Sequence, residues 1–408
     1  MRLDIPDHTD HGPDAFRRRV LYIPGYDPFP PRRYRELYRK EGAAQAAISG
    51  YQIAIAAKAA AGPYGWRAET RIGGRAAVAE IDVLVWSDIV RASMAQGILA
   101  TYLQLLRTAW AYIGSGALFR LMRLRKGPMI AALYPIVFLL LQLLAALLVG
   151  GYLAALAADH FHWLAGAALG TATVVALLLW FRSQDHRVFA YYLMHDYAYS
   201  AQAKGANPPA LEVRMAEFGA AIHAALNSDV DEVLVIGHSS GAHLAVSILA
   251  DLIRAGLPAD RPALGFLSLG QVVPMVSFLP GATRLRADLG YLSARDEITW
   301  IDVTAPGDGC AFALCDPVSV TGVAPEGKLW PLVISAAFTL TLSAERWRAL
   351  RWRFFRLHFQ YLCAFDRPGD YDYFQITAGP VTLADRFRGR SPSKSRIEAP
   401  VNRWRGVS

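Results

Sequence analysis

Short apolar runs alternate with longer stretches of helical spacing along most of the chain. The runs predict strands at residues 19–26, 80–86, 233–236, 263–269 and 298–304. The stretches between them predict helices at residues 32–61 and 212–226, and another directly after the strand at 233–236. Strands that alternate with helices favour an α/β fold, in which a mostly parallel sheet is covered by helices on both faces.

One region departs from this alternation because it is apolar on all sides. Residues 127–181 contain no lysine or arginine, and residues 129–158 and 161–181 are each long enough to span a bilayer. Pro135 and the Gly150-Gly151 pair are expected to bend the first span. We therefore predict an inserted transmembrane helical hairpin; the alternative is a pair of buried helices or an apolar active-site lid in a soluble protein.

The charges that flank the hairpin predict its orientation. Basic residues precede the first span and follow the second, whereas the connection around Asp159 has none; the basic residues are Arg120, Arg123, Arg125, Lys126, Arg182 and Arg187. The positive-inside rule then places both ends in the cytoplasm. The first ten residues are polar and acidic, so no signal peptide is expected and the remaining domain should stay cytoplasmic.

Composition agrees with a membrane setting. Apolar residues make up 54% of the chain and charged residues only 19%, with a net charge of +8. Many of the basic residues lie beside the hairpin or among the aromatic residues of segment 346–356, which favours a bilayer over a nucleic acid as the partner. The alternative for that segment is a solvated arginine face on an ordinary helix. The arginine-, serine- and proline-rich tail, 386–408, is predicted to be disordered.

The strand at 233–236 leads into the most specific motif of the chain. Gly237-His238-Ser239-Ser240-Gly241 joins this strand to an apolar helix, which is the strand–turn–helix context of a nucleophile elbow. Glycines on both sides allow the sharp turn that lifts the serine hydroxyl clear of the sheet. Ser239 is the candidate nucleophile, and the alternative is a Gly/Ser turn in a plain βα unit.

The order of elements and the elbow resemble the α/β-hydrolase fold over residues 19–374, and within it bacterial membrane-associated α/β-hydrolase-like proteins. The resemblance implies a hydrolase domain in two parts, residues 1–126 and 183–385, interrupted by the hairpin at 127–182 and followed by the tail at 386–408. It also implies an inner-membrane protein whose catalytic domain is cytoplasmic.

The resemblance implies a Ser, Asp, His order for a catalytic triad along the chain. His358 is the only histidine after His243, and His243 lies on the elbow helix, too close in sequence to reach the serine, so His358 is the candidate base. Three aspartates near the strand at 298–304 are candidates for the acid: Asp302, Asp308 and Asp316. Asp308 is preferred because it stands in a Pro-Gly loop just after that strand, and Asp316 is the second choice.

An oxyanion hole is implied at two backbone amides, those of Ser240 and Tyr26. Pro24 replaces the histidine that is common at this point of the fold, which leaves the geometry of the Pro24-Gly25-Tyr26 loop open.

These residues predict a membrane-anchored serine hydrolase that cleaves an ester or thioester of an apolar acyl group, with lipid as the natural substrate. The alternatives are an acyltransferase with the same triad and a non-catalytic membrane scaffold. The chain has no GxxxxGK[ST] phosphate loop and no HExxH zinc motif, and its three cysteines form no CxxC pair, so no cofactor or metal is expected. Acyl length and oligomeric state stay open at this level.

Overall fold

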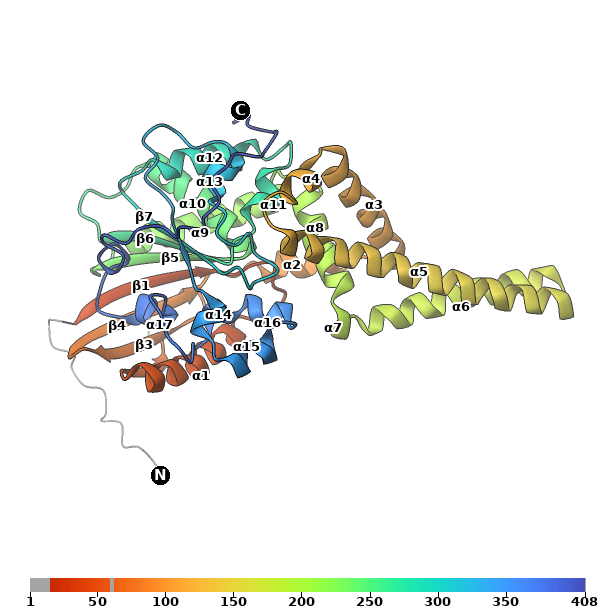
Figure 1. The fold of residues 1–408 in the computed structure, drawn as a ribbon, viewed down its shortest axis with the longest axis horizontal. Helices are drawn as coiled ribbons and strands as arrows, with labels where there is room; N and C mark the ends of the chain where they lie inside the picture. The colour runs from red at the N-terminus through yellow and green to blue at the C-terminus, as the bar shows by residue number, and fades with distance from the viewer. Residues whose placement is uncertain (1–14, 59–61, 408) are drawn as a thin grey trace, which may run out of the picture.

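Eight strands form one mixed sheet in the order β2-β3-β4-β1-β5-β6-β7-β8. The computed structural model describes residues 15–58 and 62–407 (Figure 1). The strands are β1 Phe16–Ile23, β2 Gln52–Ala57, β3 Gly65–Ile72, β4 Arg75–Val83, β5 Glu232–His238, β6 Ala263–Leu269, β7 Thr299–Thr304 and β8 Leu332–Ser335. Neighbours from β4 to β8 in this order are parallel, whereas β3 is antiparallel to both β2 and β4. The predicted α/β class with a mostly parallel sheet is therefore confirmed.

Each of the five predicted strands overlaps a strand of this sheet, but three further strands were missed. The helix predicted at 32–61 is wrong for residues 50–58, because α1 (Arg32–Ser49) ends at Gly50 in the left-handed conformation, with a φ of 72°. The last three residues of that prediction, 59–61, lie outside the described residues. The chain then turns into β2, which forms an antiparallel ladder with β3. β2 is rich in alanine, so its strand conformation comes from pairing with β3 rather than from local preference.

Helices cover both faces of the sheet and divide its core into two layers. Alternate residues of β1 enter different layers: Val20 and Tyr22 pack with α1 and α17 (Tyr373–Ala378), whereas Leu21 and Ile23 pack on the opposite side. That second layer is covered by α9 (Pro209–Leu226), α10 (Ser240–Ala255) and α12 (Thr283–Ser293). The strands are thus buried on both faces, as a parallel sheet requires.

The remaining short elements lie in the connections. They are α2 Ser87–Met94, α4 Ala117–Leu121, α7 Asp185–Val188, α11 Val273–Ser277, α13 Pro317–Thr321, α14 Phe338–Thr341, α15 Ala344–Leu350, the 3-10 helix Gln360–Leu362 and α18 Leu383–Arg386.

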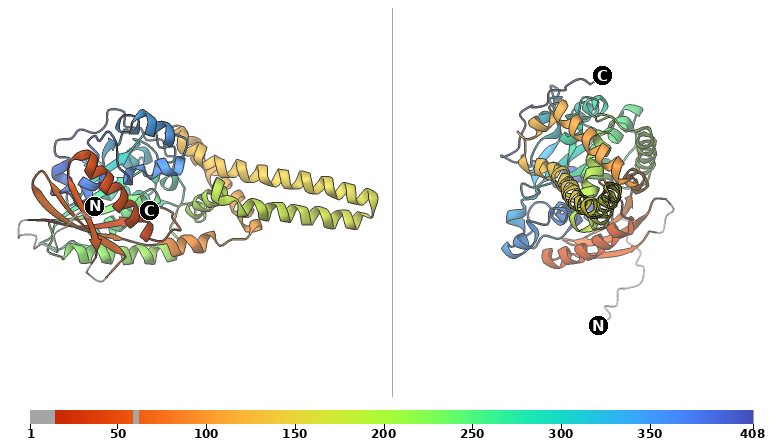
Figure 2. Two further views of the ribbon diagram at one scale, coloured as in Figure 1. Left: turned by 90° about the horizontal axis from the view of Figure 1, so that it is seen from below. Right: turned by 90° about the vertical axis from the view of Figure 1, so that its right-hand side faces the viewer.

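The hairpin consists of α5 (Lys126–His160) and α6 (Trp163–Ser183), which project together away from the sheet (Figures 1 and 2). Both are long and apolar enough to cross a membrane. α5 is one helix through Pro135 and Gly150, so the bends expected there do not interrupt it. Most of the apolar side chains on the projecting part are exposed, among them Leu141, Leu148, Val175, Leu179 and Trp180.

Small residues hold the two helices of the hairpin against each other. A methyl group added at Gly170 would lie 2.7 Å from the Ala154 Cβ, and one added at Gly166 would lie 2.4 Å from the Ala154 carbonyl oxygen. Gly166 and Gly170 are four residues apart and so share one face of α6. Close backbone approach at a small-xxx-small face is a typical packing mode of membrane helices.

Helices α3 (Ile98–Gly114) and α8 (Ala190–Ala201) attach the hairpin to the domain that carries the sheet, hereafter the body. The Tyr102 hydroxyl donates to the Leu139 carbonyl at 3.0 Å, and the Tyr134 hydroxyl donates to the Val188 carbonyl at 2.8 Å. α8 packs against α5 of the hairpin and against α2 and α11 of the body, and it follows the second span after only the short helix α7.

The tail predicted to be disordered is ordered across residues 386–407, so that prediction is wrong. The Ile397 amide donates to the Leu314 carbonyl at 2.7 Å, and the Asp316 amide donates to the Ile397 carbonyl at 2.9 Å. Asn402 is buried and donates to the Ser277 carbonyl at 3.1 Å. Composition indicated disorder because it counts few apolar residues, whereas backbone and amide hydrogen bonds to the body hold this segment. The acidic start, on which the expectation of no signal peptide rests, lies outside the described residues.

Candidate active site

Ser239 occupies the tight turn between β5 and α10 with a φ of 55° and a ψ of −121°. A non-glycine residue rarely adopts this conformation, which costs on the order of 1–3 kcal/mol and persists only when the surroundings enforce it. Here the Ser239 amide donates to the Leu269 carbonyl of the neighbouring strand at 2.9 Å. The strand–turn–helix context that the sequence predicted for the elbow is present.

Two glycines make room for this turn. A methyl group on Gly241 would lie 2.2 Å from the Ile23 carbonyl oxygen, so any side chain there would force α10 away from β1. A methyl group on Gly25 would lie 2.9 Å from the Ser239 Cβ, so the loop after β1 approaches the serine closely only because residue 25 is glycine. Gly25 lies in the loop where the oxyanion hole was expected.

His358 and Asp308, 50 residues apart in the chain, are hydrogen-bonded in the structure. The His358 Nδ1 lies 2.7 Å from the Asp308 Oδ2, and both side chains are buried. His358 ends α16 (Phe354–His358), and Asp308 lies in the loop that follows β7. The other ring nitrogen, Nε2, is buried and has no hydrogen-bond partner among residues 15–58 and 62–407.

The environment of Asp308 keeps it ionised. Burial alone would raise the pKa of this carboxyl, but a positive charge on His358 and three hydrogen bonds outweigh burial and lower it. The three donors are His358, the Cys310 amide at 2.9 Å and the Tyr361 hydroxyl at 3.0 Å. A carboxylate held in this way fixes the orientation of the imidazole and stabilises its protonated form.

The other two candidate acids are engaged elsewhere. Asp302 lies within β7, where its Oδ1 accepts a hydrogen bond from the hydroxyl of Ser268 on the neighbouring strand β6 at 2.6 Å. Asp316 caps the first turn of α13 and pairs with Lys328 at 2.5 Å. Among the three aspartates that the sequence left open, the structure joins Asp308 to His358.

His238 holds the backbone of His358 through a hydrogen bond. Its Nε2 lies 3.0 Å from the His358 carbonyl oxygen, which can only accept, so Nε2 carries the proton. Burial, followed by the nearby His358 charge, lowers the pKa of His238 to about 3, so the ring is neutral at physiological pH. The two rings are 4.9 Å apart between centroids. The elbow histidine thus anchors the backbone of the candidate base.

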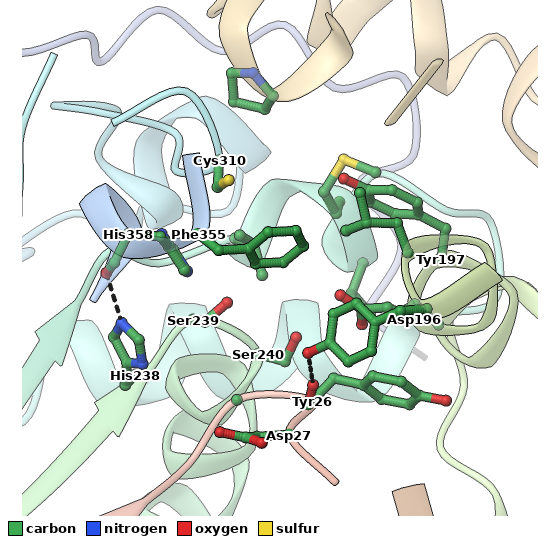
Figure 3. Close-up of a pocket in the computed structure, with 18 of the residues that line it drawn as sticks. Tyr26, Asp27, Asp196, Tyr197, His238, Ser239, Ser240, Cys310, Phe355 and His358 are labelled. Carbon is green, nitrogen blue, oxygen red and sulfur yellow. Dashed lines mark hydrogen bonds between the residues drawn. The ribbon is translucent and has the colours of Figure 1, made fainter. Parts of the chain in front are cut away.

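Ser239 and His358 face one cavity with a volume of about 70 Å³ (Figure 3). No hydrogen bond joins the Ser239 hydroxyl to the His358 ring within the described chain. Tyr26 and Ser240 line the same cavity, and no hydrogen bond from the backbone amide of either residue is found in the described ranges. The cavity therefore brings together a hydroxyl, an imidazole nitrogen and the two residues whose amides were expected to form the oxyanion hole.

Sequence reasoning missed three residues of this site. Tyr361 donates to Asp308 and accepts from the Ala305 amide at 3.0 Å, which links the acid loop to the 3-10 helix that follows α16. Asp196 and Phe355 line the cavity from α8 and α16. No motif marks them, and only the proximity of Tyr361 and Phe355 to His358 in the chain could have drawn attention to those two.

Asp308, Cys310 and His358 are the described residues whose ligand atoms lie close enough together, within 4.8 Å of one another, for a metal ion. These three residues do not suit a metal ion, because Asp308 and His358 are hydrogen-bonded to each other. Burial also raises the pKa of the Cys310 thiol, which disfavours the thiolate that binds metals.

Comparison with known proteins does not assign the chain to a family. No protein-family model, curated protein or solved structure matches the chain.

Proposed function

We propose that the protein is a membrane-anchored serine hydrolase of the α/β-hydrolase fold that cleaves esters or thioesters of apolar acyl groups. One observation carries the proposal: a serine in a strained strand-to-helix turn shares a cavity with a buried, unpaired imidazole nitrogen whose ring is held by a carboxylate. Such a nucleophile, base and orienting acid is the arrangement used for acyl transfer.

The chemistry follows from the positions of these groups. His358 Nε2 accepts the proton as the Ser239 hydroxyl attacks the ester carbonyl, and it later returns that proton to the departing alcohol. Asp308 stabilises the imidazolium between these steps. The amides of Tyr26 and Ser240 receive the negative charge that develops on the carbonyl oxygen. Water then attacks the acyl-enzyme, with His358 acting as base again.

The topology supports the same assignment. The serine follows β5 in the middle of the sheet, the acid follows β7, and the histidine comes later in the chain. This Ser, Asp, His order at the carboxyl ends of parallel strands is the order expected of the α/β-hydrolase fold.

Anchoring supports an amphipathic substrate. The hairpin is exposed and apolar, its root contacts α8, and α8 lines the cavity. A catalytic domain held at the bilayer meets lipid esters at high local concentration. The cavity, at about 70 Å³, is smaller than the roughly 300 Å³ or more of a usual ligand site. A long acyl chain therefore binds here after side chains such as Phe355 move.

Labelling with a fluorophosphonate tests the proposal, because the probe reacts with an activated serine whatever the natural substrate is. We expect the detergent-solubilised wild-type protein to be labelled, and Ser239→Ala and His358→Ala to lose labelling. Asp308→Asn should slow labelling by roughly four orders of magnitude, since the imidazole loses its orienting charge.

Matched controls come from exposed residues of the same types. Ser391→Ala, His223→Ala and Asp229→Asn should be labelled like the wild type. A folded wild-type protein that is not labelled, or a Ser239→Ala variant that is, would refute the hydrolase assignment.

A further inference from the structure

We propose that Asp196 binds a hydrogen-bond-donating group, a hydroxyl or a protonated amine, on the alcohol portion of the ester substrate. The inference rests on the proposed hydrolase function and names the substrate class of the same site: esters whose alcohol carries a polar donor close to the scissile bond.

Asp196 reaches the site from α8, which follows the hairpin after the short helix α7. It lines the cavity together with Ser239, Ser240 and His358. In Figure 3, Asp196 and His358 lie on opposite sides of the two serines. A substrate bound at Ser239 therefore places one of its two parts beside the Asp196 carboxyl.

The Asp196 carboxyl differs from the other carboxyls of the site because no residue in the described ranges donates to it. Asp27 accepts from the Tyr34 hydroxyl at 2.6 Å and the Phe29 amide at 2.9 Å, and Asp308 accepts from His358. Asp196 is partly buried in the cavity wall, where carboxyls that lose contact with water are normally paired, so the lack of a partner requires an explanation.

The electrostatic environment of Asp196 is consistent with a carboxyl that lacks a hydrogen-bond donor. Burial raises the pKa of Asp196 to about 7, and a positive charge on His358 only partly opposes this shift. The cost of burial is relieved when a ligand donates a hydrogen bond to the carboxylate, and such bonds to charged groups are stronger than neutral ones.

An adjacent cavity indicates which part of the ester lies at Asp196. It shares Tyr197 and Met275 with the active-site cavity, and its lining contains no charged side chain. It is bordered by α3 and the first turns of α5, at the root of the hairpin, through residues such as Ile113, Met129 and Ile136. The apolar cavity suits the acyl chain, whereas the Asp196 carboxyl has nothing to pair with on an acyl chain and therefore suits a polar group of the alcohol.

Three octanoate esters that differ only in the alcohol test this assignment. They are 2-hydroxyethyl octanoate, 2-(dimethylamino)ethyl octanoate, which is protonated at neutral pH, and propyl octanoate, which has a methyl group in place of the hydroxyl. We expect the wild-type protein to show a kcat/KM roughly ten- to a hundredfold higher for at least one donor-bearing ester than for the propyl ester. Asp196→Ala should reduce that preference to within about twofold.

Asp196→Asn provides a second variant of the same size. It keeps an oxygen that accepts from a hydroxyl but loses the charge, so it should retain part of a hydroxyl preference and none of an ammonium preference. Asp229→Asn is the matched surface control and should behave like the wild type.

Fluorophosphonate labelling of the same samples separates the two levels of inference. If all variants are labelled at Ser239 but the wild type shows no preference, or Asp196→Ala retains it, the role of Asp196 is refuted and the hydrolase proposal stands. If the folded wild-type protein is not labelled, the hydrolase proposal fails and the role of Asp196 fails with it.

Discussion

Buried carboxyls of this protein differ in charge because their partners differ. Asp308 receives three hydrogen bonds and a neighbouring positive charge, which lower its pKa. Asp302 is equally buried but accepts one hydrogen bond, from Ser268, and its second oxygen has no partner in the described part of the chain. Burial, with a smaller contribution from Asp316, raises the pKa of Asp302 to about 8 despite the Ser268 bond.

The raised pKa of Asp302 predicts a pH dependence of stability. Between the unfolded pKa of about 4 and the folded pKa of about 8, the folded state holds a proton that the unfolded state has released. The stability that this residue contributes is therefore fully present below pH 4 and falls as the pH rises toward 8, by about 1.4 kcal/mol per pH unit. Asp302→Asn stays neutral and should lack this loss.

Thermal unfolding followed by tryptophan fluorescence in detergent measures the effect. The Tm of Asp302→Asn minus that of the wild type should increase steadily from pH 5 to pH 8, whereas the same difference for Asp229→Asn should stay constant. A difference that does not change with pH would mean that Asp302 is ionised in the folded protein.

At the scale of elements, the packing of the hairpin depends on small residues where α5 and α6 meet. A methyl group on Gly170 would meet both the Ala154 Cβ and the Gly150 carbonyl oxygen, whereas one on Gly151 would meet no atom of the described residues within 4 Å. Gly170 and Gly151 thus differ in what a side chain would encounter.

Gly170→Leu should separate α5 from α6, because an overpacked interface typically costs 1–3 kcal/mol. Hydrogen–deuterium exchange in detergent should become roughly tenfold faster in peptides from both helices. Gly151→Leu is the matched control and should leave exchange unchanged. Equal exchange in the two variants would show that the helices do not depend on this contact.

For the whole molecule, a hairpin that crosses the bilayer twice would place its tip on the side opposite the body. Asp159 lies near the tip, at the end of α5, and Asp229 lies on the body before β5. In intact spheroplasts, a membrane-impermeant maleimide should label Asp159→Cys and spare Asp229→Cys, because the charge pattern predicts a cytoplasmic body.

Lysis should expose Asp229→Cys to the same reagent, and the wild-type protein serves as the control for its own three cysteines. Labelling of Asp229→Cys but not of Asp159→Cys in intact spheroplasts would invert the predicted orientation. Labelling of neither would show that the hairpin does not cross the membrane.

Local pattern was sufficient for the α/β class, the strand-to-helix turn at Ser239, and a long apolar hairpin. These features depend on neighbours within a few residues or on composition over a span, and both can be read along the chain. Strands β2 and β3 and the ordered tail were missed because they are held by pairing and by hydrogen bonds with distant segments.

The site shows the same division. The elbow motif marks Ser239, and chain order narrows the base to His358, but three aspartates near β7 were candidates for the acid, with Asp308 preferred only for its place in the loop after the strand. Only the folded chain joins Asp308 to His358, adds Tyr361 to that pair, and turns Asp302 and Asp316 elsewhere. It also brings Asp196 from α8 to the cavity. Side-chain direction and burial are set by contacts between segments that lie far apart in the chain, so no local pattern contains them.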